Sequence, residues 1–499
     1  MGTKLKILFW IDGFFLHFSL AYYLQSQLDA DFFGIIDINS KPKKFFQNQN
    51  LVNFKKIWFF HDHIRKTHQT PDYNYLSNFE KKYQIDLWKL VLNERFFYLH
   101  NRFYKFDKQE ILSILEQELK LFESMLDEIK PDYFLTYFPA LHHQKLLLEI
   151  CKRKGIKILN MCRTGINDQT VLVEDGLTFD LDLNQTLDYY NKNKITTDVT
   201  KDIYDLDQKI WIKHRDVKIW NKIIGLKDYL LDSDNELINS NFMYYGRTKF
   251  KVIKDALSLE YKKNRNYSFL KKFAISSPSL NISFVYFPLN INEEQSLLHQ
   301  APYYTNQIEV IRHIAKSIPI NYLLYVKEHV AAGLRGWNDV EYYKQIIDIP
   351  NVQFIHPEFD NNILIKNSKL VIAIRGTSTL KAVQFGKPTI TFGKQPYQII
   401  PFVFAVNSLD SLPELIKKAL ECKTNPLDYE RFNDYFSIDG FDFPLNVYEI
   451  IRNKALLSGN GVFSNVLISN KNMIDFLEKN KQLFKDLIQS HLKILLKNN

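Results

Sequence analysis

The chain of 499 residues has few cysteines, glycines and prolines, and these scarcities narrow the class of protein. Three cysteines, Cys151, Cys162 and Cys422, are too few and too scattered for a disulfide framework or a zinc site, and they fit a reducing compartment. Glycine and proline number 16 each, and 45% of the residues are hydrophobic, which argues against long disordered stretches. The length predicts two or three domains.

Long runs of one residue type are also lacking. No stretch approaches the ~20 apolar residues that span a bilayer. The apolar segment Ile7 to Leu24 is split by Asp12-Gly13 and lacks a small-residue cleavage site, so a strand, a turn and a helix explain it better than a signal peptide. Despite a net charge of +9, no run of five Lys/Arg occurs, which argues against nucleic-acid binding. We expect a cytoplasmic protein, with peripheral contact to the inner face of the cytoplasmic membrane left open.

The first 190 or so residues alternate β-rich runs with helical patterns. Strands are predicted at Lys6–Ile11, Phe32–Ile36, Lys56–Phe60, Tyr133–Tyr137 and Lys157–Asn160. Between the last two, apolar residues of Ala140–Lys154 recur at helical spacing, and Gly155 ends that helix. Such repetition predicts a parallel sheet with right-handed crossovers.

A second alternating block follows a charge-rich stretch with helices predicted at Asp202–Lys218 and Lys249–Lys263. The strands of the block are predicted at Ile282–Phe287, Tyr322–Val326, Val352–Ile355, Leu370–Ile374 and Thr389–Phe392. Its helices are predicted at Thr305–Ser317, Val340–Ile347, Asn361–Asn367 and Ser378–Phe385. This tight spacing indicates a compact doubly wound domain.

Near the C-terminus, the apolar residues of Phe476–Leu496 fall on one helical stripe. Packing back across the domains is the expected role, with partner docking or interfacial membrane contact as alternatives. The predicted fold class is therefore α/β, with a Rossmann-like domain over residues 1–195 and a helical linker or insertion over 196–280. A second Rossmann-like domain over 281–425 and a helical segment over 426–499 complete it.

Polar residues follow two strands of the second block, where an open α/β sheet binds its ligands. Lys327, Glu328 and His329 come directly after one strand, and Arg335 follows in the same loop. His329 could hydrogen-bond a phosphate while Lys327 or Arg335 adds charge. The alternative is a Lys–Glu surface pair beside a capping histidine.

The segment Arg375-Gly376-Thr377-Ser378-Thr379 opens a helix after another strand. Gly376 lets the backbone approach a ligand closely, and the free N–H groups of the helix start can receive a phosphate. A plain turn and cap is the alternative. We expect this segment to lie on a strand next to Lys327-Glu328-His329, which would strengthen the phosphate-site interpretation. A third loop carries Gly393 and Tyr397.

These segments occur in a fixed order that resembles one family. They are Phe284–Leu289, Lys327-Glu328-His329, Pro350-Asn351-Val352, Gly376-Thr377, and Gly386-Lys387-Pro388 with Phe392-Gly393. Together they resemble capsule polysaccharide biosynthesis proteins, a group that includes capsule-type transferases of 3-deoxy-manno-octulosonate (Kdo). The resemblance covers residues 282–405 and, faintly, 130–175. It implies a GT-B fold, in which two Rossmann-like doubly wound domains face a cleft.

The resemblance further implies a glycosyltransferase. Its donor would be a nucleotide-activated sugar, CMP-Kdo-like or a UDP- or GDP-sugar, and its acceptor a growing surface polysaccharide or glycolipid. The donor phosphates would lie between His329 and the helix start at Thr377–Thr379, and Glu294 and Ser296 would face the cleft. No cofactor, no metal and no nucleic acid are expected. Two departures from relatives occur. Val330 stands where relatives usually have Pro, which could be neutral. Lys381 stands near a position where they often have an acid, which would alter ribose or sugar recognition and leaves the donor open.

The catalytic base is expected from the N-terminal domain. Asp12, at the carboxyl end of the first strand, is the first candidate and His17 the second, although Asp-Gly is also an ordinary turn. His61-Asp62-His63 is interpreted as a solvated loop, and His142-His143 as lining a cleft or capping a helix rather than binding metal. Asp180-x-Asp182, which mimics the metal pair of the other glycosyltransferase fold class, follows no nucleotide-binding βα unit and is rejected.

Two alternatives share this architecture. A nucleotide-sugar 2-epimerase would need acids and histidines gathered in the cleft, and the sequence alone identifies no such set. A non-catalytic polysaccharide-assembly protein would be favoured by Val330 and Lys381. Fold alone does not choose among these functions.

Overall fold

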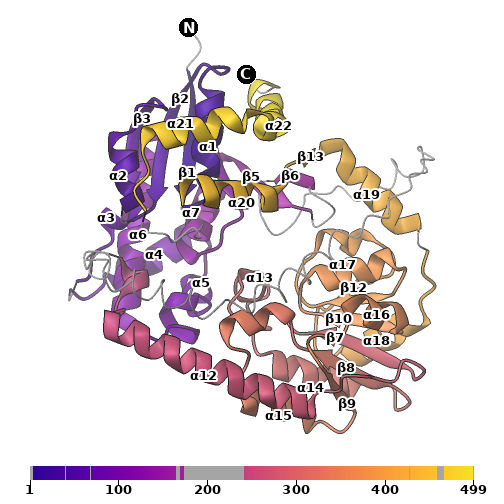
Figure 1. The fold of residues 1–499 in the computed structure, drawn as a ribbon. Coiled ribbons are helices and arrows are strands. Elements are labelled where there is room, and N and C mark those ends of the chain that lie inside the picture. Colours follow the sequence, from indigo (N-terminus) through magenta and orange to yellow (C-terminus); the bar gives the residue numbers. More distant parts are fainter. Residues whose placement is uncertain are drawn as a thin grey trace. The chain divides into compact units, whose positions relative to one another are not determined.

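A computed structural model describes residues 4–39, 41–67, 69–164, 169–173, 241–425, 427–457 and 466–497. The chain divides into two compact units, each with its own sheet (Figure 1). The first unit comprises Met1–Asp180, Ser233–Thr248 and Phe436–Asn499, and the second comprises Leu181–Asp232 and Lys249–Tyr435. Asp180-x-Asp182 and the predicted helix Asp202–Lys218 lie outside the described residues.

The sheet of the first unit has the strand order β13-β6-β5-β4-β1-β2-β3. Its members are β1 (Leu5–Asp12), β2 (Ala30–Asp37), β3 (Phe54–Phe59), β4 (Tyr133–Tyr137), β5 (Lys157–Arg163), β6 (Gln169–Val173) and β13 (Phe441–Asp442). Strands β1 to β5 are parallel, β6 pairs antiparallel with β5, and β13 pairs antiparallel with β6. The chain order reverses between β1 and β4, so the carboxyl end of β1 lies at the switch point where doubly wound sheets bind ligands.

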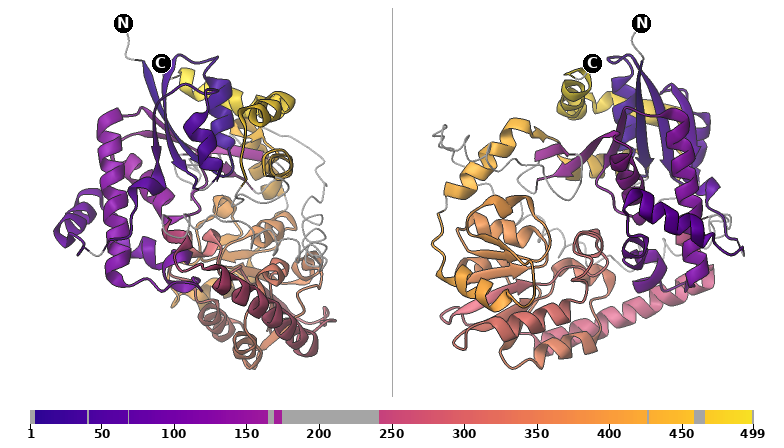
Figure 2. Two further views of the ribbon diagram at one scale, coloured as in Figure 1. Left: turned by 60° about the vertical axis from the view of Figure 1, so that its left-hand side comes forward. Right: turned by 180° about the vertical axis from the view of Figure 1, so that it is seen from behind.

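Alternate residues of β1 supply the two cores of this unit, because successive side chains of a strand point to opposite faces. Ile7 and Phe9 join α1 (Leu16–Leu24), α2 (Lys41–Asn48) and the C-terminal helices, whereas Leu8 and Trp10 join the other face. The helices of that other face are α4 (Tyr73–Tyr83), α5 (Leu87–Leu92), α6 (Lys108–Ile129) and α7 (His142–Arg153) (Figure 2). An Asp107–Glu110 capping box starts α6.

The C-terminal residues pack on α1 as three helices. They are α20 (Leu445–Leu456), α21 (Asn470–Lys479) and α22 (Lys485–Lys497). The single helix predicted over Phe476–Leu496 is wrong, because α21 ends at Lys479 and a 3₁₀ turn, η5 (Lys481–Phe484), precedes α22. The Asn480 side chain donates to the Phe476 carbonyl at 2.7 Å, which satisfies a carbonyl that a continuing helix would use. The apolar stripe still faces one core.

The second unit contains a fully parallel sheet of order β12-β11-β10-β7-β8-β9. Its strands are β7 (Phe284–Pro288), β8 (Leu323–Lys327), β9 (Val352–Ile355), β10 (Leu370–Ala373), β11 (Thr389–Thr391) and β12 (Val403–Ala405). The predicted strands β7 to β11 are confirmed within two residues. The neighbouring placement predicted for β8 and β10 is wrong, because β7 is central and lies between them.

Helices cover both faces of this second sheet. On one face α12 (Lys249–Phe273), α14 (Gln307–Ser317), α15 (Val340–Ile347) and α18 (Leu412–Glu421) share a core, and on the other α16 (Asn361–Asn367) and α17 (Thr377–Gln384) share a smaller one. Further elements are α13 (Gln295–Leu298), α19 (Leu427–Asp439), and the 3₁₀ turns η3 (Val330–Arg335) and η4 (Pro396–Ile399). Among the described helices, none has the length and apolar character needed to cross a bilayer.

Candidate functional site

Two polar regions lie at the carboxyl edges of the two sheets. In the second unit, the loops after β7 and β10 meet at the switch point. The side chain of Asn290, two residues beyond β7, donates to the Arg375 carbonyl at 2.6 Å, and Gln307 accepts the Asn290 backbone N–H at 2.8 Å. These bonds hold the β7 loop against the start of α17.

The start of α17 is open. Gly376 precedes the helix with φ 137°, a conformation that only glycine adopts readily, and both Gly376 and Thr377 are exposed. The hydroxyl of Thr379 donates to the Gly376 carbonyl at 2.7 Å, and that of Tyr397 donates to the same oxygen at 3.3 Å. Within the described residues no acceptor meets the backbone N–H groups of Thr377 and Ser378. The helix dipole and these N–H groups therefore favour an anion here.

The three residues after β8 differ in their surroundings. Lys327 is only 3% exposed, and in the described part of the chain its Nζ makes no hydrogen bond. Burial lowers the pKa of Lys327 to about 8, against the opposing effect of Glu328 and Asp360. Glu328 is fully buried and accepts from the His329 backbone at 2.7 Å, from the Asn338 amide at 2.7 Å and from the Tyr343 hydroxyl at 2.9 Å. It therefore anchors the loop and has little capacity left for a ligand.

His329 is exposed and caps η3. Its Nδ1 accepts the Ala331 backbone N–H at 3.2 Å, so the neutral ring carries its proton on Nε2. That Nε2–H is a hydrogen-bond donor for an external acceptor. Arg335, by contrast, forms an ion pair with Glu293 at 3.2 Å, and Glu294 lies 3.9 Å from it.

The other predicted residues of this unit have supporting positions. Arg375 donates to Gln395 at 3.3 Å. Ser296 lies in the short helix α13, and Tyr397 is buried beneath the start of α17. Lys381 is buried, and its Nζ donates to Asn362 of α16 at 3.0 Å, so this departure from the family pattern serves the contact between α16 and α17.

In the first unit, a cavity of about 160 Å³ opens beside the carboxyl ends of β1 and β2. Its lining includes Asp12, Asp37 and His61, together with Arg95 and Gln144. Asp12 accepts the Phe14 backbone N–H at 3.0 Å. Desolvation raises the pKa of Asp12 to about 6, and the neighbouring Asp37 acts in the same direction. A carboxyl group with this pKa can exchange a proton near neutral pH.

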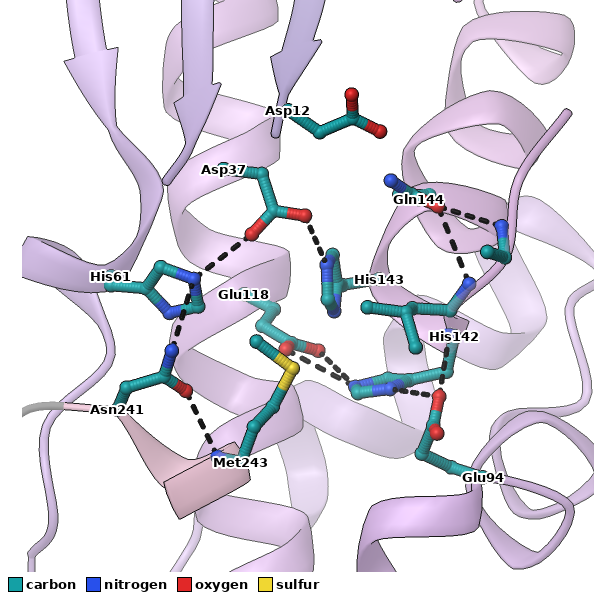
Figure 3. A network of polar contacts seen from close by, with 12 residues as sticks. Asp12, Asp37, His61, Glu94, Glu118, His142, His143, Gln144, Asn241 and Met243 are labelled. Atoms are coloured by element: carbon teal, nitrogen blue, oxygen red, sulfur yellow. Dashed lines mark hydrogen bonds and ion pairs between the residues drawn. The ribbon is translucent and has the colours of Figure 1, made fainter. Parts of the chain in front are cut away.

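Asp37 lies between two histidines (Figure 3). One carboxylate oxygen is 2.9 Å from His61 Nε2 and the other is 3.2 Å from His143 Nε2. Burial opposes ionisation of this group, yet the two histidines lower the pKa of Asp37 to about 2. The cavity therefore contains two carboxyl groups whose pKa values are driven apart, as in acid–base sites.

Behind the cavity, His142 sits between Glu94 and Glu118, and all three side chains are fully buried. His17 lies elsewhere, inside the core on the α1 face, where burial and His491 lower its pKa to about 3. The structure thus places Asp12 at the cavity and does not bring His17 to it.

The solvated loop predicted for His61-Asp62-His63 is wrong at His61. Phe60 starts a short helix, α3 (Phe60–His63), which turns His61 inward to 5% exposure, whereas Asp62 and His63 are exposed. Asp37 was not among the predicted site residues, although it ends β2 as Asp12 ends β1. Glu118 could have been found from the sequence, because it is the only acidic residue on the apolar, buried stripe of α6.

Residues 243–402, which contain β7 to β11 and α17, match the family model for capsule polysaccharide biosynthesis proteins. A search of curated proteins finds no match. The two sheets, each with helices on both faces, make the chain an α/β protein.

Solved structures give distant similarities. The β-Kdo 2,7-transferase of Thermosulfurimonas dismutans KpsC is 10% identical and matches over 63% of this chain and 79% of its own, with a TM-score of 0.29. The β-Kdo 2,4-transferase of the same protein is 10% identical, with coverages of 60% and 79% and a TM-score of 0.30. UDP-GlcNAc 2-epimerase from Neisseria meningitidis, bound to UDP-GlcNAc, is 12% identical, with coverages of 92% and 100% and a TM-score of 0.26. These superpositions carry no argument about the reaction.

Proposed function

We propose that the chain is a glycosyltransferase that moves a sugar from a nucleotide-activated donor to a growing surface polysaccharide or glycolipid. The family match supports this function class. The observation that carries the proposal is the open start of α17 at the switch point of the second sheet, where an exposed Gly376 and the N–H groups of Thr377 and Ser378 favour a phosphate. A glycolipid acceptor would require peripheral contact with the membrane that holds it.

The donor would extend along the carboxyl edge of the second sheet. Because neighbouring strands lie about 4.8 Å apart, the ends of β8 and β10 are separated by roughly 10 Å, with β7 between them. One phosphate at the start of α17 does not reach Lys327 and His329. We infer that these two residues contact a second anionic or hydroxyl group of the same nucleotide-sugar.

The proposed reaction is a displacement at the anomeric carbon. The acceptor hydroxyl oxygen forms a bond to that carbon while the bond to the donor phosphate oxygen breaks, and the phosphate keeps the electron pair. The N–H groups of α17 stabilise the departing phosphate. Asp12, with a pKa of about 6, takes the proton of the acceptor hydroxyl. This scheme uses no cofactor and no metal ion.

Thermal-shift measurements with CMP, UDP, GDP and their sugar conjugates test the donor site. A ligand present at 100 times its dissociation constant stabilises the protein by about 2.7 kcal/mol. We expect one nucleotide series to raise Tm and the His329→Ala variant to lose most of that shift. His313→Ala, which changes a histidine of α14, is the matched control. If none of these nucleotides or conjugates shifts Tm of the folded protein, the proposed site for a CMP-, UDP- or GDP-activated donor is refuted.

A nucleotide-sugar 2-epimerase is the second candidate. The acids and histidines that this function requires are gathered in the first unit, where Asp12 and Asp37 share a cavity with His61. Incubation with UDP-sugars in deuterated water, without any acceptor, separates the two functions. Deuterium at the sugar carbon next to the anomeric carbon would establish epimerisation. A donor that stays unchanged without an acceptor, and is consumed only when an acceptor is added, would support transfer.

A further inference from the structure

A buried cluster in the first unit has the composition of a metal site. Glu118 of α6 and His142 and His143 of α7 each offer one ligand atom, and the three atoms lie within 4.8 Å of one another. The three residues are at most 1% exposed. Glu118 approaches His142 Nε2 to 3.0 Å.

Each of the two histidines also has a carboxylate at its other side. His142 Nδ1 lies 3.0 Å from Glu94, and His143 Nε2 lies 3.2 Å from Asp37. Metal-binding histidines almost always donate their second ring N–H to a carboxylate or carbonyl, which fixes the tautomer and the ring orientation. The pairs His142–Glu94 and His143–Asp37 have this arrangement, and they leave His142 Nε2 and His143 Nδ1 as the nitrogens for a ligand.

One of these nitrogens is buried without a partner. Among the described residues, His143 Nδ1 is inaccessible and makes no hydrogen bond. In Figure 3 the ring directs Nε2 to Asp37, and its other side is turned towards Glu118 and His142. A buried polar atom without a partner costs free energy, so this nitrogen calls for an explanation that a bound ion would supply.

The buried carboxylates of the cluster also favour a bound cation. Glu94, Glu118 and Asp37 are three carboxyl groups removed from water. A divalent cation bound between Glu118 and the two histidines would balance the charge of these carboxylates.

We propose that Glu118, His142 and His143 bind one zinc-type divalent cation, with Glu94 and Asp37 orienting the two histidines. Two imidazoles and a carboxylate suit Zn²⁺, whose bonds of about 2.0–2.2 Å set tetrahedral ligand separations near 3.4 Å. The cluster would need to contract by about 1.4 Å at most. The three ligands are not among the residues that line the cavity, so the ion would have a structural role, fastening α6 to α7.

This inference is independent of the donor site. The test uses untagged full-length protein that has been stripped with EDTA and dialysed free of chelator. Co²⁺ is the spectroscopic probe, because tetrahedral nitrogen and oxygen coordination gives visible ligand-field bands. We expect bands that saturate at one Co²⁺ per chain, disappear on addition of Zn²⁺, and accompany a rise in Tm. The stripped wild-type protein supplies this result even if a variant fails to fold.

His143→Gln and Glu118→Gln are the informative variants, and His63→Gln is the matched control because His63 is exposed outside the cluster. We expect each cluster variant to lose the Co²⁺ bands and the Zn²⁺-dependent rise in Tm, and the control to keep both. Absence of bands and of any Tm change in the wild type would overturn the proposal and leave His142 paired only with Glu94 and Glu118. Bands that persist in both folded cluster variants would overturn it equally.

Discussion

The buried pair of His142 and Glu118 permits a quantitative prediction for the metal-free protein. Glu118→Gln keeps the size of the side chain and removes its charge, leaving Glu94 as the one carboxylate partner of His142 among the residues that the structure describes. Removing one partner of a buried ion pair typically costs 3–5 kcal/mol. We expect a loss of about 3 kcal/mol in the free energy of unfolding, because Glu94 remains.

The pH dependence of stability gives an independent value. The folded pKa of His142, about 10, lies above its ordinary value of 6.5, so this group contributes stability that is fully present below pH 6.5 and is lost as pH rises towards 10. Between pH 7 and pH 10 the loss is roughly 4 kcal/mol, from 1.36 kcal/mol per pH unit. In Glu118→Gln the loss should end at a lower pH, because the pKa of His142 is raised less.

Urea denaturation in the presence of EDTA, repeated across this pH range, measures both quantities. Glu128→Gln is the matched control, since Glu128 lies on the same helix in an exposed pair with Lys56 at 2.6 Å and should change stability by less than about 1 kcal/mol. The reasoning fails if Glu118→Gln matches the wild type in both stability and pH profile, or if the control is equally destabilised.

Three further predictions concern the proposed sites. Asp12→Asn should lower kcat of sugar transfer by a factor of about 10²–10⁴ and remove the acidic limb near pH 6 from the pH–rate profile. The thermal shift with donor nucleotide should stay unchanged, and a lost shift would mean that the variant is misfolded. Gly376→Ala should weaken nucleotide binding, because a residue with a Cβ adopts a φ of 137° only at a cost of about 1–3 kcal/mol. Unchanged affinity in a nucleotide titration would show that the start of α17 is not part of the site. Asp37→Asn should lower the free energy of unfolding, measured in urea at pH 7, by about 2 kcal/mol. The lowered pKa of Asp37 contributes stability above pH 4 that is lost as pH falls to about 2. A variant as stable as the wild type would contradict the pairing of Asp37 with His61 and His143.

Much of the fold could be predicted because buried parallel strands are short apolar runs. Val352–Ile355 and Tyr133–Tyr137 were predicted with their observed bounds, and the helix Val340–Ile347 likewise. The order of β8, β7 and β10 in the sheet could not be predicted from the sequence, because each later strand can pair on either side of β7. Asn480 broke the last predicted helix through a side-chain bond that apolar spacing does not reveal.

The candidate sites were predictable only in part. Asp12 follows from topology alone, because it ends a central strand at the switch point. The pairing of Asp37 with His143 joins residues 106 positions apart, one at the end of β2 and the other in the first turn of α7. The burial of His61 depends on one short helix after β3. Such side-chain meetings follow from packing and leave no local pattern in the sequence.

The packing of the C-terminal helices on α1 has a consequence for synthesis of the protein on the ribosome. The Tyr23 hydroxyl donates to the Leu477 carbonyl at 2.6 Å, and Leu487 and Leu495 complete the same core as Phe9. After the first 180 residues emerge, roughly 300 more must be translated before this apolar face is covered, which takes about 15–60 s at 5–20 residues per second. During that interval α1 and α2 alone cover this face of the sheet, and the apolar side chains that later contact the C-terminal helices stay exposed. We therefore expect the nascent first unit to be prone to aggregation and to bind chaperones.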